Sequence, residues 1–203
     1  MAILAVYPLG MGCLMLYESL FWKPRASNTI LDLVAWTGNE QVLDVGCGRG
    51  LMLVSAARRL TSGTAVGIDI WRSQDQASNG PQVAMQNAIA EGVADRVRVE
   101  TGDMRKLPFD DASFDIVVSN WVVHNLDAKP DRALAMAEMI RVLRPGGKVL
   151  LADIVLRHEY VTTFQALGAK DVQIVVPQPL KDTLLRIVSF GSYHPSTVIA
   201  VKA

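Results

Sequence analysis

Short apolar runs, rich in branched residues, alternate with stretches of helical periodicity from residue 41 onward. Runs of this kind, bounded by glycine and polar residues, are typical of strands buried on both faces of a sheet. They predict strands at Gln41–Val45, Thr64–Ile68, Val97–Glu100, Phe114–Ser119, Lys148–Ala152, Val172–Val176 and Thr197–Val201.

The stretches between these runs have apolar positions three and four residues apart, as helices covering a sheet do. They predict helices at Leu51–Leu60, Gln82–Glu91, Pro130–Leu143 and Arg157–Leu167. Gly92 is expected to close the second helix, and Pro145-Gly146-Gly147 to stop the third. Strand and helix alternation predicts an α/β domain whose parallel sheet carries helices on both faces.

The first residues differ from the rest, because no charged residue precedes Glu18. The uncharged run is shorter than the roughly 20 residues of a membrane-spanning helix. Three interpretations stay open: a helix packed on the domain, a membrane-associating segment, or the remnant of a longer anchor. We therefore divide the chain into residues 1–26, an apolar segment and linker, and residues 27–203, the main domain. Ser27 or Asn28 is expected to cap a helix that runs to about Trp36.

Composition narrows the classes of partner. Lysine plus arginine equals aspartate plus glutamate at 20 each among 203 residues, whereas nucleic-acid binders usually have a basic excess. No nucleic-acid partner is expected, and a small-molecule substrate is favoured. The two cysteines form no disulfide framework and no metal-binding spacing, so we expect no metal. A cytoplasmic location follows, with membrane association through residues 1–22 as an open alternative.

A glycine-rich turn follows the first predicted strand, with Gly46, Gly48 and Gly50 around Cys47 and just after Asp44. Glycines there let the backbone turn tightly and approach a ligand, and the turn leads into a helix N-terminus that favours polar ligand groups. The spacing G-x-G-x-G differs from the G-x-G-x-x-G of dinucleotide sites, which disfavours a nicotinamide oxidoreductase.

Two acidic residues follow the next two strands. Asp69 ends the second strand, where a carboxylate can accept both hydroxyls of a ribose, and Asp103 follows the third strand beside Gly102. Because the carboxyl ends of parallel strands share one edge of a sheet, we expect these acids to meet the glycine turn there.

The run V-L-D-V-G-C-G-R-G at Val42–Gly50 resembles the first motif of the class I S-adenosylmethionine (SAM)-dependent methyltransferases. The resemblance covers about Gln41–Asp153, and Leu107-Pro108-Phe109 is similar to a stretch of the small-molecule, type 11-like branch. It implies a Rossmann-like, doubly wound sheet of seven mostly parallel strands with the last antiparallel. It also implies SAM as methyl donor, with S-adenosylhomocysteine as product.

The resemblance assigns roles at matching positions. Ile70 would pack on adenine, Asp103 would face its exocyclic amine, and Asn120 would line the methionine half of SAM. The full implied cofactor set is Asp44, Gly46, Cys47, Gly48, Gly50, Asp69, Ile70, Gly102, Asp103, Met104, Asn120 and Trp121. The fourth strand does not end in the N/D-P-P-Y/F pattern of enzymes that methylate flipped bases, which disfavours a nucleic-acid substrate.

His124 is the candidate catalytic base, because it follows the fourth strand at the rim where an acceptor would lie. A packing role for His124 stays open, and His158, Glu159 and Tyr160 are weaker candidates. The function predicted is in-line methyl transfer to a small acceptor, with a lipophilic one favoured. The alternative is a SAM-binding module that acts with a partner subunit. Residues 1–22 or Pro177–Pro195 could form a lid over the acceptor; the oligomeric state is not predicted.

Overall fold

A computed structural model describes residues 23–72, 80–176 and 195–203. Residues 1–22 and almost all of Pro177–Pro195 lie outside this range, so the lid, the membrane contact and the domain boundary stay predictions. No helix among the described residues is long and apolar enough to cross a membrane.

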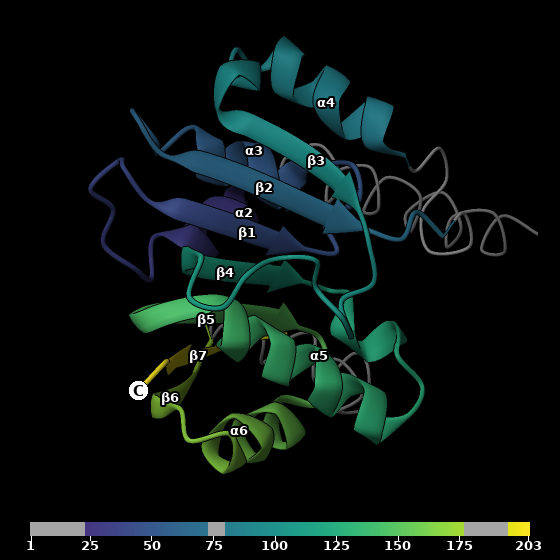
Figure 1. The fold of residues 1–203 in the computed structure, drawn as a ribbon, viewed down its shortest axis with the longest axis vertical. Coiled ribbons are helices and arrows are strands. Elements are labelled where there is room, and N and C mark those ends of the chain that lie inside the picture. Colours follow the sequence, from purple (N-terminus) through teal and green to yellow (C-terminus); the bar gives the residue numbers. More distant parts are fainter. Residues whose placement is uncertain (1–22, 73–79, 177–194) are drawn as a thin grey trace, which may run out of the picture.

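Seven strands form one sheet in the order β3-β2-β1-β4-β5-β7-β6 (Figure 1). The strands are β1 Gln41–Val45, β2 Thr64–Asp69, β3 Val97–Thr101, β4 Phe114–Asn120, β5 Leu143–Asp153, β6 Lys170–Val175 and β7 Ser196–Val201. The pairs among β1 to β5 are parallel, whereas β7 runs antiparallel to both β5 and β6. The predicted fold class is confirmed, and its strand order reverses between β1 and β4, where such sheets bind ligands.

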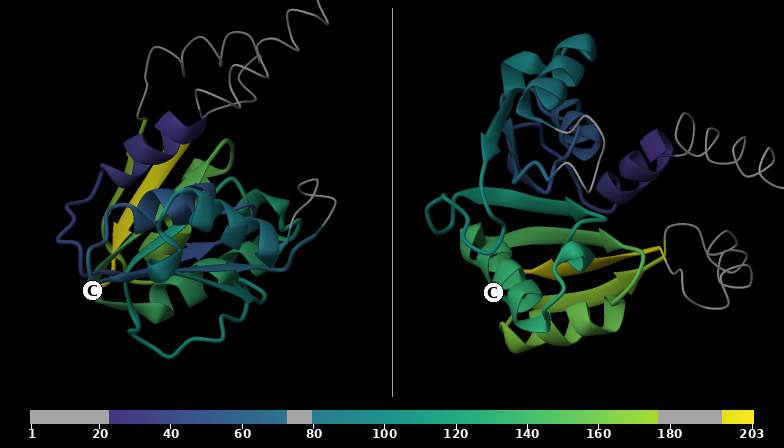
Figure 2. Two further views of the ribbon diagram at one scale, coloured as in Figure 1. Left: turned by 90° about the horizontal axis from the view of Figure 1, so that it is seen from above. Right: turned by 90° about the vertical axis from the view of Figure 1, so that its right-hand side faces the viewer.

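Helices cover both faces of the sheet (Figures 1 and 2). One face carries α2 Lys23–Leu31, α3 Leu51–Ala57 and α4 Pro81–Ala90, and the other carries α5 Lys129–Val142 and α6 Arg157–Ala166. Two 3₁₀ turns, η2 Ala94–Arg96 and η3 Val123–Asn125, precede β3 and α5. The residues of β1 alternate between the two layers, since Val42 packs with the first set of helices and Leu43 with the second.

Two helix boundaries differ from those expected. Helix α2 begins at Lys23, inside the expected linker, and ends at Leu31. Ser27 is not its cap, because its buried hydroxyl bonds the Ser55 hydroxyl of α3 at 3.1 Å. Trp36 lies beyond the helix, and its indole N–H donates to the Leu31 carbonyl at 2.8 Å, which satisfies an end carbonyl of α2.

Helix α5 stops at Val142, three residues before Pro145, and the chain continues directly into β5. The predicted stop is thus correct in place, although the Pro145-Gly146-Gly147 turn is a bulge within β5, where the register against β4 shifts. Gly146 has a φ of 78°, which a residue with a side chain adopts only with strain.

Candidate active site

The glycine turn lies at the carboxyl edge of the sheet, between β1 and α3. Gly46, Gly48 and Gly50 have φ values of 75°, 49° and 84°. A Cβ on Gly46 would lie 2.5 Å from Cγ1 of Val122, the residue that follows β4 by two positions. The turn therefore folds against the segment after β4, and only glycine fits at its first position.

Asp69, at the end of β2, holds the turn from the opposite side. Its Oδ2 accepts the Gly48 N–H at 2.9 Å, and its Oδ1 accepts the Trp71 N–H at 2.7 Å. Each carboxylate oxygen keeps further acceptor capacity, so the group can also receive hydroxyls of a ligand. The structure thus brings Asp69 and the glycine turn together, as the sequence predicted.

Asp44, near the end of β1, is 1% exposed. Its Oδ2 has no hydrogen-bond partner among the described residues. Burial raises the pKa of Asp44 to about 7; the N–H of Leu53 opposes this change, and the nearby charge of Asp69 adds to it. A buried carboxyl group with an unpaired oxygen beside the glycine turn fits a ligand group that carries a positive charge or N–H donors.

The Cys47 side chain packs toward β2. Its thiol is buried, and a Cβ on Gly67 of β2 would come within 2.8 Å of its Sγ. Burial raises the pKa of the Cys47 thiol well above its usual range, which makes it a poor nucleophile. The side chain therefore packs between the turn and β2.

Asp103 is bound by a residue that the sequence did not single out. The Arg105 guanidinium donates through Nε to both carboxylate oxygens at 3.1 Å and through Nη2 to Oδ2 at 2.6 Å. These bonds hold the pKa of Asp103 below its usual range. Arg105 also binds Asp131 in the first turn of α5 at 2.9 Å, so it ties the loop after β3 to that helix.

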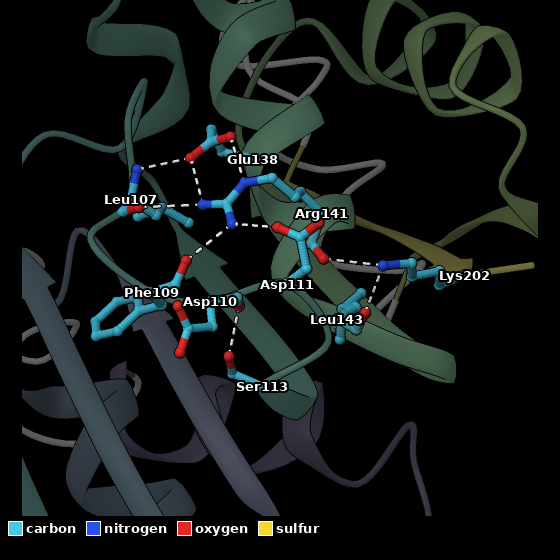
Figure 3. Close-up of polar contacts among 9 residues, drawn as sticks. All are labelled: Leu107, Phe109, Asp110, Asp111, Ser113, Glu138, Arg141, Leu143 and Lys202. Atoms are coloured by element: carbon cyan, nitrogen blue, oxygen red, sulfur yellow. Dashed lines mark hydrogen bonds and ion pairs between the residues drawn. The ribbon is translucent and has the colours of Figure 1, made fainter.

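A second anchor holds the same loop at the other end of α5 (Figure 3). The Arg141 guanidinium donates to the backbone carbonyls of Leu107 and Phe109 at 3.1 and 2.8 Å, and to Glu138. Glu138 in turn accepts the Leu107 N–H at 2.8 Å. The Leu107-Pro108-Phe109 stretch is thus a structural anchor for the loop that carries Asp103.

The remaining predicted cofactor residues divide between edge and core. Ile70 and Trp121 follow β2 and β4 and are 36% and 37% exposed, which is high for large apolar side chains. Asn120 ends β4 half-buried. Met104 packs against the core, and a Cβ on Gly102 would lie 2.7 Å from Ile68.

Three of the five non-glycine residues with positive φ in the described part of the chain lie at the same edge. Trp71, Trp121 and Leu156 have φ values of 58°, 57° and 60°. They follow β2, β4 and β5 respectively, and a left-handed backbone costs about 1–2 kcal/mol for a residue with a side chain. Strain of this kind concentrates at functional sites, where the surrounding structure holds it in place.

His124, in η3, lies after β4 at the same edge of the sheet. Its Nδ1 lies 2.6 Å from Oδ1 of Asp153, at the end of β5, whose side chain is 2% exposed while that of His124 is 24% exposed. Asp153 also accepts the Tyr160 hydroxyl at 2.9 Å and the Ile154 N–H at 2.7 Å. A buried carboxylate with three donors orients a partly exposed imidazole, an arrangement suited to proton transfer.

The weaker base candidates are not placed for that role. Tyr160 is wholly buried against Asp153, and burial raises the pKa of its hydroxyl above the usual range. Glu159 forms an ion pair with Arg132 at 2.7 Å, and His158 is exposed on α6. Asp153 was missed, although its position at the end of the strand beside β4 was a usable signal. The described residues contain no group of side chains that could hold a metal.

A family model described as a methyltransferase domain matches residues 43–151. The chain belongs to this methyltransferase family. The match confirms the resemblance to class I SAM-dependent methyltransferases and spans both the glycine turn and His124.

Several proteins of this family are similar to the chain. The methyltransferase GfsG of Streptomyces halstedii is 37% identical over 66% of this chain and 44% of its own. The nocamycin O-methyltransferase of Saccharothrix syringae is 33% identical over 86% and 60%. The chain spans 44% and 45% of GfsG and of the 27-O-demethylrifamycin SV methyltransferase of Amycolatopsis mediterranei.

Solved structures share the fold at low identity. A geranyl diphosphate methyltransferase in complex with SAM has a TM-score of 0.68 and 18% identity, over 89% of this chain and 85% of that one. The [4+2]-cyclase SpnF also has a TM-score of 0.68 and 18% identity, over 88% and 81%. Since a cyclase shares the fold, the fold alone does not select the reaction.

Proposed function

We propose that this chain transfers a methyl group from SAM to a small apolar acceptor, and that His124 takes up the proton which the acceptor loses. The observation that carries the proposal is the His124–Asp153 pair, held at the same sheet edge as the glycine turn. The non-catalytic alternative would need no such oriented base.

Five features of the chain fit the cofactor. The Gly46–Gly50 turn would let SAM approach the backbone closely, and Asp69 would accept hydrogen bonds from its ribose hydroxyls. The unpaired oxygen of Asp44 would face a positive charge or an N–H donor of the cofactor. Ile70 would cover one face of the adenine, and Asp103 would face its exocyclic amine. When bound, SAM supplies a methyl group on a sulfonium, which is already activated toward a nucleophile.

His124 has its proton and acceptor positions set by Asp153. A proton on Nδ1 would be donated to Asp153 Oδ1, which leaves Nε2 as the acceptor for a substrate proton. Asp153 then stabilises the imidazolium that forms. Oxygen and carbon acceptors both lose a proton on methylation, so this role suits either; the relatives include an O-methyltransferase and a sterol 4-C-methyltransferase.

The proposed acceptor is apolar because the rim is apolar. Trp121 and Leu156, after β4 and β5, are 37% and 38% exposed, although both are large hydrophobic residues. They follow the same two strands as His124 and the strand-ending Asp153, so an acceptor near that pair would bury them. We propose that the enzyme is cytoplasmic, because its two cysteines suit a reducing compartment. We also propose that residues 1–22, which carry no charge before Glu18, contact the acceptor or a membrane.

Turnover by His124→Gln tests the proposal. The full chain is incubated with SAM and either demethylmenaquinone or an apolar phenol, and both S-adenosylhomocysteine and methylated acceptor are quantified. His124→Gln is expected to lower kcat about 10²–10⁴-fold while SAM affinity stays the same. His158→Gln, the same substitution on exposed α6, is the matched control. Wild-type turnover by His124→Gln would reject the base role.

A further inference from the structure

Arg132, in the first turn of α5, is a cation that is only 8% exposed, and its guanidinium makes four hydrogen bonds. Its Nε and Nη2 donate to the two carboxylate oxygens of Glu159 at 2.7 and 3.1 Å. Its Nη1 donates to the backbone carbonyls of Leu126 and Asp127 at 2.7 and 2.8 Å. One guanidinium thus joins α5 to α6 and to the segment that enters α5.

Two partners of Arg132 lie close in sequence to residues that form the His124–Asp153 arrangement. Leu126 follows His124 by two residues, so its carbonyl anchors the segment that carries the imidazole. Glu159 is adjacent to Tyr160, whose hydroxyl donates to Asp153 Oδ2 at 2.9 Å. Arg132 therefore bonds a residue two positions after His124 and the residue before Tyr160, and none of these four bonds is to the pair itself.

We infer that Arg132 is a positioning residue for His124: it fixes the segment after the histidine and the helix whose Tyr160 holds Asp153. The inference rests on the proposed function, because it assigns Arg132 a part in orienting the base. A planar guanidinium has its donors in a rigid fork, so it can hold four acceptors on two other segments in one geometry. Lysine has the charge without the fork.

Stability alone is a weak explanation for this arginine. A buried ion pair often contributes little net stability compared with apolar residues of similar size, whereas it can select one geometry. His124 bonds Asp153 of β5, Asp153 also accepts the Tyr160 hydroxyl of α6, and Arg132 pairs with Glu159, the residue before Tyr160. A change at Arg132 or Glu159 should therefore reach His124 through the position of Asp153.

Ring ¹⁵N NMR of the histidines tests this directly in the full chain, with no acceptor required. The chain has only three histidines, so the spectrum of His124→Gln assigns the His124 signals. Neutral His124 of the wild type is expected in the Nδ1–H form, with Asp153 as acceptor. Arg132→Lys keeps the positive charge, and Glu159→Gln keeps the length of the side chain that Arg132 binds. The two conservative variants therefore test the same Arg132–Glu159 contact from both sides.

Both variants are expected to increase the Nε2–H fraction of His124 about threefold or more, and to lower kcat about tenfold with unchanged KM for SAM. Arg141→Lys is the matched control, because Arg141 makes comparable bonds at the other end of α5 but none near His124. Its loss of thermal stability should resemble that of Arg132→Lys, with the wild-type His124 spectrum.

Folded Arg132→Lys and Glu159→Gln proteins with wild-type His124 signals would overturn the inference. This result is distinct from failure of the proposed function, which is judged by turnover of His124→Gln. If His124→Gln keeps its activity while the tautomer still follows Arg132, the base role is wrong and the positioning of the imidazole by Arg132 stands.

Discussion

Replacing Asp44 with asparagine removes a buried, titrating carboxyl group from the end of β1. Burial, aided by the charge of Asp69, raises the pKa of Asp44 to about 7 in the folded protein, whereas an unfolded aspartate titrates near 4. Between these values the folded state binds one more proton than the unfolded state does. Stability therefore falls as pH rises through this window, and it becomes level above pH 7.

The size of the effect follows from the two pKa values. Each pH unit well inside the window costs the wild type about 1.4 kcal/mol, and the slope fades near pH 7, so between pH 5 and pH 8 the loss is about 3 kcal/mol. Asparagine does not titrate, and its amide oxygen can keep the bond from the Leu53 N–H. Any fixed cost of the unpaired amide N–H cancels when the two proteins are compared across pH.

Urea unfolding of both proteins at pH 5, 6, 7 and 8 measures this difference. Between pH 5 and pH 8, the free energy of unfolding of the wild type should fall by about 3 kcal/mol relative to that of Asp44→Asn. The same variant should bind SAM more weakly, because it lacks the anionic group that would meet the cofactor. If the free energies of unfolding of the two proteins change in parallel with pH, Asp44 does not have a raised pKa in the folded protein and this reasoning is wrong.

Two further substitutions test the packing of the site. Gly46→Ala places a Cβ against Val122 and should cost about 1–3 kcal/mol more than Gly146→Ala, which has nearly the same φ but no neighbour within 4 Å; equal melting temperatures would argue against the close approach. Tyr160→Phe removes a donor from buried Asp153 and should lower the free energy of unfolding by about 1–3 kcal/mol in urea; an unchanged midpoint would show that the bond contributes nothing.

The sheet and the contact between Asp69 and the glycine turn could be predicted because their signals are local. Glycine turns and strand-ending acids lie next to their strands in the sequence, so Asp69 and Gly48 were expected together. The Gly48 N–H donates to Asp69 Oδ2 at 2.9 Å. The start of α2 was not predicted, because Ser27 looks like a helix cap and instead bonds Ser55, 28 residues away. Its partner follows from how α2 packs on α3, which no local pattern shows.

The acceptor half depends on contacts between distant residues. His124 was singled out, but Asp153 is 29 residues away and its role depends on how β4 and β5 end relative to each other. Tyr160 was a candidate base from its place after β5, yet the burial of α6 turns its hydroxyl into a donor to Asp153. Arg105 and Arg132 look like surface cations in the sequence, and only the packing of α5 gives them partners.

Calorimetric titration of SAM into the full chain, with Asp69→Asn measured alongside, tests the central claim that the carboxyl edge of β1 and β2 holds this cofactor. The account predicts saturable binding by the wild type and at least about tenfold weaker binding by Asp69→Asn, because that variant loses an ionised acceptor for the ribose hydroxyls. No binding by the folded wild type, or equal affinity in both proteins, would contradict it.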